Sequence, residues 1–138
     1  MLEKKIGFLQ EYLSKLSVYV SLSDDAILGN DDKLLAMERS FQLVVDETID
    51  INAVIAYQLK GTVPESYRST FYEMVPLGII DQSFADTISE SAKVRNQLTH
   101  DYEKLSRTDM VVAIKKFFKV YQTYAAILVK KFLNDESR

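Results

Sequence analysis

The sequence predicts an all-α fold, an antiparallel bundle of about five helices in a single domain that spans residues 1–138. Apolar residues recur at spacings of three and four along most of the chain, whereas the alternation typical of strands is nearly missing. There are only two prolines, so long uninterrupted helices are allowed. A length of 138 residues suits one domain that buries a single core.

The first helix is expected over about residues 2–20, where one apolar stripe consists of Leu2, Ile6, Leu9, Leu13, Leu16 and Val20. Segment 24–31 contains a Gly-Asn pair and predicts a loop followed by the next helix start. A second helix is expected over about residues 32–60, and Gly61 then supplies a left-handed C-terminal cap.

Apolar residues of this second helix occupy more than one face, and they are Leu34, Leu35, Phe41, Val44, Val45, Ile49, Val54, Ile55 and Leu59. A helix that is apolar on more than one side needs a second packing partner. That partner is either a second copy of the chain or the other four helices arranged around a central one. The sequence leaves both alternatives open.

Three further helices follow. Segment 62–65, Thr-Val-Pro-Glu, predicts a capping box that starts a short third helix, which stops near Pro76. Asp81 can cap a fourth helix, and segment 106–109 opens a long final one. The lysines expected on the solvated side of the final helix are Lys115, Lys116, Lys119, Lys130 and Lys131.

Composition excludes several classes of function. Cysteine is absent, so there is no disulfide framework, thiolate nucleophile or zinc ribbon, and a cytoplasmic location is expected. No stretch approaches the roughly 20 apolar residues of a membrane span, and no metal-ligand spacing or phosphate loop occurs. We therefore expect no membrane contact, metal or cofactor. The net charge of −3 argues against broad adhesion to nucleic acid, but residues 91–107 carry a local +2 that suits phosphate contact.

Residues 95–102 concentrate the potential chemistry, because they include Arg95, Tyr102 and the only histidine, His100. Arginine presents a charged planar fork that matches two phosphate oxygens, and imidazole titrates near neutral pH. On a continuous helix, Arg95 and His100 would point roughly 140° apart. They converge on one ligand only if the helix ends near Thr99 or if two chains combine their residues. The competing interpretation of the histidine is a helix cap.

Cleavage of RNA through its own 2′-hydroxyl needs a base, an acid and a cation at the phosphate. One histidine per chain is too few for an acid–base pair. A two-fold homodimer that faces this segment against its copy supplies two histidines and two arginines in one cleft. The residues are therefore consistent with a metal-independent, dimeric ribonuclease.

Other polar and aromatic residues are less specific. Asp46 and Asp50 lie one turn apart on the second helix, where they either orient Arg95 or His100 or form a solvated acidic stripe. Seven tyrosines are best interpreted as core or interface aromatics in preference to base-stacking groups. They are Tyr12, Tyr19, Tyr57, Tyr67, Tyr72, Tyr121 and Tyr124.

Segment 95–102 has the form Arg-Asn-x-x-x-His-x-Tyr, which resembles the signature of the HEPN superfamily and, through its tyrosine, that of the HepT branch. The resemblance covers essentially the whole chain. A long second helix with Glu38, Gln42, Asp46 and Asp50 is similar to the family's polar face. The motif then follows in the fourth helix, and a long helix closes the domain.

This resemblance implies an HEPN-like fold and an endoribonuclease toxin of a bacterial or archaeal toxin–antitoxin pair, acting on RNA as a homodimer. Arg95 and His100 correspond to the catalytic pair, and Asn96 to a polar supporter. Tyr102 corresponds to the position to which the partner antitoxin, a minimal nucleotidyltransferase of the MntA type, attaches AMP. The AMP ester would add negative charge beside the cleft and block RNA entry.

The sequence departs from the family pattern at Thr99, where relatives usually carry a small or aliphatic residue, and at Ser106, where they often carry an acidic one. Two other functions compete with the nuclease. The first is a non-catalytic subunit that binds nucleotide or substrate for a small nucleotidyltransferase, with Arg95 gripping phosphate. The second is a purely structural dimerisation bundle in which the motif only caps helices.

Overall fold

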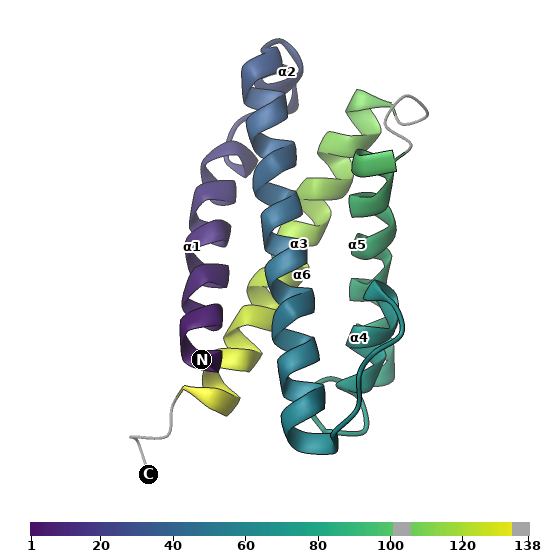
Figure 1. The fold of residues 1–138 in the computed structure, drawn as a ribbon. Helices are drawn as coiled ribbons and strands as arrows, with labels where there is room; N and C mark the ends of the chain where they lie inside the picture. The colour runs from purple at the N-terminus through teal and green to yellow at the C-terminus, as the bar shows by residue number, and fades with distance from the viewer. Residues whose placement is uncertain (101–105, 134–138) are drawn as a thin grey trace.

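A computed structural model describes residues 1–100 and 106–133, apart from the side chains of Thr99 and His100. These residues form six helices and no strand: α1 (Leu2–Val20), α2 (Asp24–Leu28), α3 (Asp31–Lys60), α4 (Tyr67–Glu73), α5 (Gln82–His100) and α6 (Arg107–Phe132). The long helices α1, α3, α5 and α6 run antiparallel in sequence order, with α2 at one end of the bundle and α4 towards the other (Figure 1). The predicted all-α bundle is confirmed. None of the described helices is long and apolar enough to cross a bilayer.

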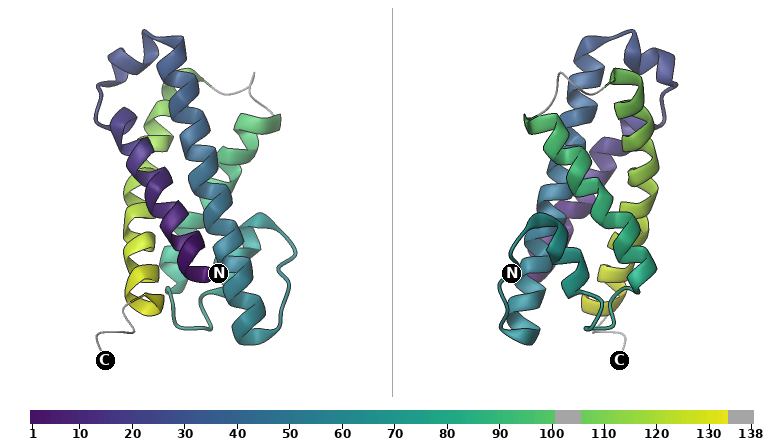
Figure 2. Two further views of the ribbon diagram at one scale, coloured as in Figure 1. Left: turned by 60° about the vertical axis from the view of Figure 1, so that its left-hand side comes forward. Right: turned by 90° about the vertical axis from the view of Figure 1, so that its right-hand side faces the viewer.

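Helix α3 lies at the centre of the bundle and packs against each of the other five helices. Its buried side chains face in several directions, and they include Leu34, Met37, Phe41, Val44, Val45, Ile51 and Ile55. Most of its apolar stripe is therefore buried within one chain, as expected for a central helix surrounded by the others, whereas Leu35 and Leu59 are each 57% exposed. Figure 2 shows α4 lying against the lower parts of both α3 and α5.

Several helix ends match the sequence. Gly61 closes α3 in the left-handed region with φ 71°, where a residue with a Cβ would be strained. The Asp81 carboxylate accepts from the Phe84 N–H at 2.8 Å at the start of α5. The Ser106 hydroxyl accepts from the Asp109 N–H at 3.2 Å at the start of α6.

Two features of the chain differ from the prediction. The expected loop at 24–31 contains the short helix α2, which Ser23 caps. Lys115 of α6 holds this helix in place, since its ammonium group donates to the Leu22 carbonyl at 2.6 Å and to the Asp24 carboxylate at 2.5 Å. Lys115 is therefore not on the solvated side. The capping box expected at 62–65 is instead formed by Ser66 and Ser69 at the start of α4. The sequence does not indicate α2 because a five-residue helix is too short to show a periodicity. It does not indicate the Ser66–Ser69 capping box because serine pairs are common outside capping boxes.

Buried hydrogen bonds connect α6 to α3, α4 and α5. The Tyr124 hydroxyl donates to the Asn52 side-chain oxygen at 2.5 Å, and the Asn52 amide donates to the Thr70 hydroxyl at 3.2 Å. Thr70 donates in turn to the Tyr67 carbonyl at 2.9 Å. The Tyr121 hydroxyl pairs with that of Ser91 on α5 at 2.6 Å.

Burial raises the pKa of both Tyr121 and Tyr124 well above its ordinary value. Both hydroxyls therefore stay protonated at neutral pH, and each finds a partner on a neighbouring helix. Because an unpaired buried polar group is costly, these bonds fix the positions of α4 and α5 relative to α6.

A candidate active site around Arg95

Arg95 projects from α5 onto a carboxylate of the central helix. Its Nε donates to Oδ1 of Asp46 at 2.8 Å and its Nη2 to Oδ2 at 3.2 Å, so the pair is bidentate. The side chains are 17% and 38% exposed, respectively. Hydrogen bonding to Asp46 raises the pKa of Arg95 by more than partial burial lowers it. The guanidinium is therefore a permanent, well-oriented cation.

Tyr67 supplies a second contact to the same guanidinium from α4. The Arg95 Cζ atom lies 5.2 Å from the centroid of the Tyr67 ring, within the range of a cation–π interaction. Tyr67, Arg95 and Asp46 line a cavity of about 230 Å³ together with Ile49 and Asp50. Three helices, α3, α4 and α5, thus contribute side chains to one small hollow.

The structure brings together some of the residues predicted for the site. Asp46 contacts Arg95 directly, whereas Asp50 is exposed and lines the same cavity. Asn96 is exposed on α5. The α5 backbone is helical through His100, but the His100 side chain and Tyr102 lie outside the described residues. The convergence of Arg95 and His100 therefore stays a prediction.

The sequence assigned Tyr67 no role at the site and grouped it with core and interface aromatics. It is in fact 46% exposed and lies on Arg95. No spacing links positions 67 and 95, because they belong to different helices whose packing alone brings them together. One signal was available: Ser66 is a strong N-cap residue, which would have placed Tyr67 in the first turn of a helix.

The charges of the lining limit what the cavity can do. Arg95 contributes one positive charge, whereas Asp46 and Asp50 contribute two negative ones. A phosphate would therefore bind through directed N–H···O contacts, and not through a net positive field. Further cations would have to come from outside these five residues. Among the residues that the structure describes, no group of three His, Cys, Asp or Glu side chains is placed to hold a metal ion.

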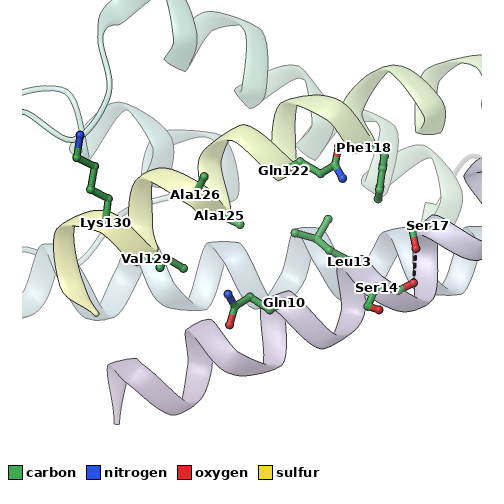
Figure 3. A pocket seen from close by; sticks show the side chains of 10 residues that line it. All are labelled: Gln10, Leu13, Ser14, Ser17, Phe118, Gln122, Ala125, Ala126, Val129 and Lys130. Carbon is green, nitrogen blue, oxygen red and sulfur yellow. Dashed lines mark hydrogen bonds between the residues drawn. The ribbon is translucent and has the colours of Figure 1, made fainter. Parts of the chain in front are cut away.

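Two of the larger hollows contain no comparable pairing of an arginine with a carboxylate. A groove of about 650 Å³ runs between α1 and α6, and Figure 3 shows apolar side chains such as Leu13 and Phe118 beside small and polar ones along it, with Lys130 as its one charged lining residue. An apolar hollow of about 510 Å³ includes Ala53, Val54 and Tyr57 of α3 and Val63 of the following loop. The second hollow continues the face of α3 that carries Asp46 and Asp50.

Comparisons with known proteins agree with this fold. A family model described as ribonuclease HepT-like matches residues 9–127. The tRNA nuclease HepT of Aphanizomenon flos-aquae (strain 2012/KM1/D3) is 27% identical over 124 residues, which are 90% of this chain and 84% of that protein.

Two solved structures have the same fold. The tri-AMPylated HEPN toxin of Shewanella oneidensis, in complex with MNT antitoxin, superposes with a TM-score of 0.80 at 20% identity, covering 92% of this chain and 95% of that one. The cytosolic protein YutE of Bacillus subtilis, of unknown function, superposes with a TM-score of 0.78 at 18% identity, covering 98% of this chain and 90% of that one.

The pairing of Arg95 with Asp46 predicts a clear order of stabilities. Asp46→Ala leaves a half-buried guanidinium without its bidentate partner and should lower the free energy of unfolding by about 1–2 kcal/mol, whereas Asp46→Asn keeps one acceptor and should cost less. Glu90→Ala is the matched control, since Arg68 and Glu90 form an exposed pair at 3.4 Å and should lose less than about 0.5 kcal/mol. Urea denaturation measures all three. Equal losses for Asp46→Ala and Glu90→Ala would contradict the assignment.

Proposed function

The chain belongs to the HepT-like ribonuclease family, and we propose that it is the toxin of a toxin–antitoxin pair, a metal-independent endoribonuclease that acts on cytoplasmic RNA as a homodimer. The observation that carries the proposal is the fixed, half-buried guanidinium of Arg95 at the wall of a small cavity, five residues before the only histidine of the chain. The family match and the similar tRNA nuclease support the same reaction class.

In the proposed mechanism, the RNA 2′-hydroxyl attacks the adjacent phosphorus while the bond from phosphorus to the 5′ oxygen breaks. One imidazole accepts the 2′ proton, and a second donates a proton to the departing 5′ oxygen, so that a 2′,3′-cyclic phosphate and a free 5′-hydroxyl result. Arg95 stabilises the charge that grows on the phosphoryl oxygens. Asp46 holds the guanidinium in one orientation throughout, which removes the need to order it during the reaction.

A second copy of the chain is required because the mechanism uses two imidazoles and each chain has one histidine. The surface beside the cavity supports such an interface. Tyr57 is 66% and Val63 78% exposed, and both line the apolar hollow next to the Arg95 cavity. Exposed apolar side chains that gather at one place mark an interaction surface. A homodimer formed there would bring the two Arg95 cavities close to each other.

Neutralisation by a nucleotidyltransferase antitoxin completes the proposal. Tyr102 follows His100 by two residues and corresponds to the AMP acceptor of the HepT motif. The similar toxin from Shewanella oneidensis is tri-AMPylated and in complex with MNT antitoxin. Each AMP would add a phosphate negative charge, which repels the RNA backbone.

The nuclease proposal predicts that the unmodified protein cleaves RNA in the presence of EDTA. Arg95→Ala and His100→Ala should each reduce the cleavage rate by at least about 10²-fold, because the first removes the cation that binds the phosphate and the second removes the proton-transfer group. Arg68→Ala, on the exposed surface, should leave the rate unchanged and serves as the control. Product analysis should find 2′,3′-cyclic phosphate ends. Intact RNA together with retained nucleotide binding would favour the non-catalytic binding subunit instead.

The interface proposal predicts that a charge at Tyr57 dissociates the dimer. Tyr57→Asp should shift the sedimentation coefficient to that of a monomer and abolish cleavage, because the carboxylate would be buried without a partner. Val18→Asp introduces the same charge at an exposed apolar position of α1 and should leave the dimer intact. Circular dichroism checks that both variants are folded. A Tyr57→Asp variant that is still an active dimer would move the interface elsewhere.

The neutralisation proposal predicts that Tyr102 is modified by its partner. Incubation with ATP and a minimal nucleotidyltransferase antitoxin of the MntA type should add one or more AMP groups, detectable by intact-mass spectrometry, and should abolish cleavage. Tyr102→Phe lacks the acceptor oxygen, so it should gain no mass and remain active. Adducts mapped to another tyrosine would reassign the acceptor.

A further inference from the structure

We propose that Tyr67 holds a nucleobase of single-stranded RNA beside the phosphate that Arg95 binds. The inference rests on the proposed function, since it adds a base-contacting residue to the same site. It assigns to Tyr67 a role in substrate binding that lies outside the Arg-x4-His-x-Tyr motif.

The position of Tyr67 at the cavity is the first support. The centroid of its ring lies 5.2 Å from Cζ of Arg95, and Tyr67 and Arg95 both line the cavity of about 230 Å³. A nucleobase and its phosphate are joined through a single ribose, so a phosphate on Arg95 leaves a base within reach of the neighbouring ring. Tyr67 is 46% exposed and can therefore offer surface to that base.

The rigidity of Tyr67 is the second support. The Tyr67 carbonyl accepts from the Thr70 hydroxyl, which is tied through Asn52 to the fully buried Tyr124. The Ser66–Ser69 capping box fixes the start of α4, and Phe71 anchors the helix edge-on between Tyr121 and Tyr124 in the core. These contacts hold the backbone of Tyr67, and Arg95 lies against its ring. A tyrosine on a fixed backbone has only two side-chain torsions to order, so it loses little conformational entropy when a base stacks on it.

The charge of the wall favours a base over a second phosphate. Asp50 lines the cavity with Tyr67, and its carboxylate repels the sugar–phosphate backbone at this place. A nucleobase is neutral and presents a flat π-surface, which stacks on aromatic rings with little dependence on sequence. The guanidinium of Arg95, which lies over the Tyr67 ring, adds to the preference for a base, because arginine also interacts favourably with the π-surface of a nucleobase.

The test uses the full-length, unmodified protein and short 2′-O-methyl oligonucleotides, which lack the attacking hydroxyl and are not cleaved. Tyr67→Leu should weaken binding of the intact oligonucleotide on the order of tenfold, whereas Tyr67→Phe should bind like the original protein. An oligonucleotide that is abasic at the contacted position should bind both variants and the original protein equally weakly. Tyr19→Leu, on α1 and outside this cavity, is the matched control and should change the affinity for neither the intact nor the abasic oligonucleotide.

Two further readouts separate base stacking from a structural role. In cleavage assays, Tyr67→Leu should raise KM and leave kcat nearly unchanged. With the original protein, 2-aminopurine placed at successive positions of the oligonucleotide should lose fluorescence at one position through stacking, and Tyr67→Leu should restore it. This readout needs no catalysis, so a protein that binds but does not cleave would contradict the nuclease proposal and still support a base contact.

Three outcomes would overturn the inference. Tyr67→Leu could bind both oligonucleotides as tightly as the original protein, or it could lose the same factor on the abasic one, which would indicate a general loss of the site. A shift of Tyr67→Leu to a monomer in sedimentation, with unchanged binding per chain, would assign the ring to the contact with a second copy.

Discussion

Two buried tyrosines on α6 determine where the side chains of the site can lie. Tyr121 and Tyr124 are one turn apart, and each must place its hydroxyl on a neighbouring helix because burial keeps it protonated and unhydrated. Tyr121 pairs with Ser91, one turn before Arg95 on α5, while Tyr124 reaches Thr70 through Asn52, one turn after Tyr67 on α4. Both sides of the cavity are therefore placed by hydrogen bonds within the core, and the site inherits the rigidity of the packing.

The pairing of Arg95 with Asp46 both helps and opposes phosphate binding. The bidentate contact fixes the fork of the guanidinium, so less rotamer entropy is lost when a ligand binds. The same carboxylate cancels the charge that would attract the ligand, and Asp50 adds a further negative charge to the lining. The cavity would therefore favour ligands whose oxygen atoms match the geometry of the guanidinium, whereas it would attract other anions only weakly. This agrees with a chain of net charge −3 that carries its positive charge locally.

The sequence predicted the long helices because burial along a helix leaves a period of three to four residues, and it predicted the ends at Gly61, Asp81 and Ser106 because caps need particular side chains. The spacing of Asp46 and Asp50 indicated a shared face. Helix α2 and the Lys115 tether were missed, since a five-residue helix has no period and a lysine on a helix gives no sign of its partner 91 residues away. The contact of Tyr67 with Arg95 depends on how α4 packs between α3 and α5, which no local pattern encodes.

A lining with one cation and two carboxylates also bears on how such a site can be switched off. Because the described residues of the cavity give no net attraction for phosphate, the proposed binding of RNA would depend on a few directed contacts and on cations supplied from elsewhere. One added phosphate group near these contacts competes for the same donors and repels the substrate at the same time. A strongly basic groove would tolerate such an addition with a small loss of affinity. A site whose lining has no net positive charge would respond to a single modification, and this is the physical condition under which the proposed attachment of AMP to one tyrosine would act as an off switch.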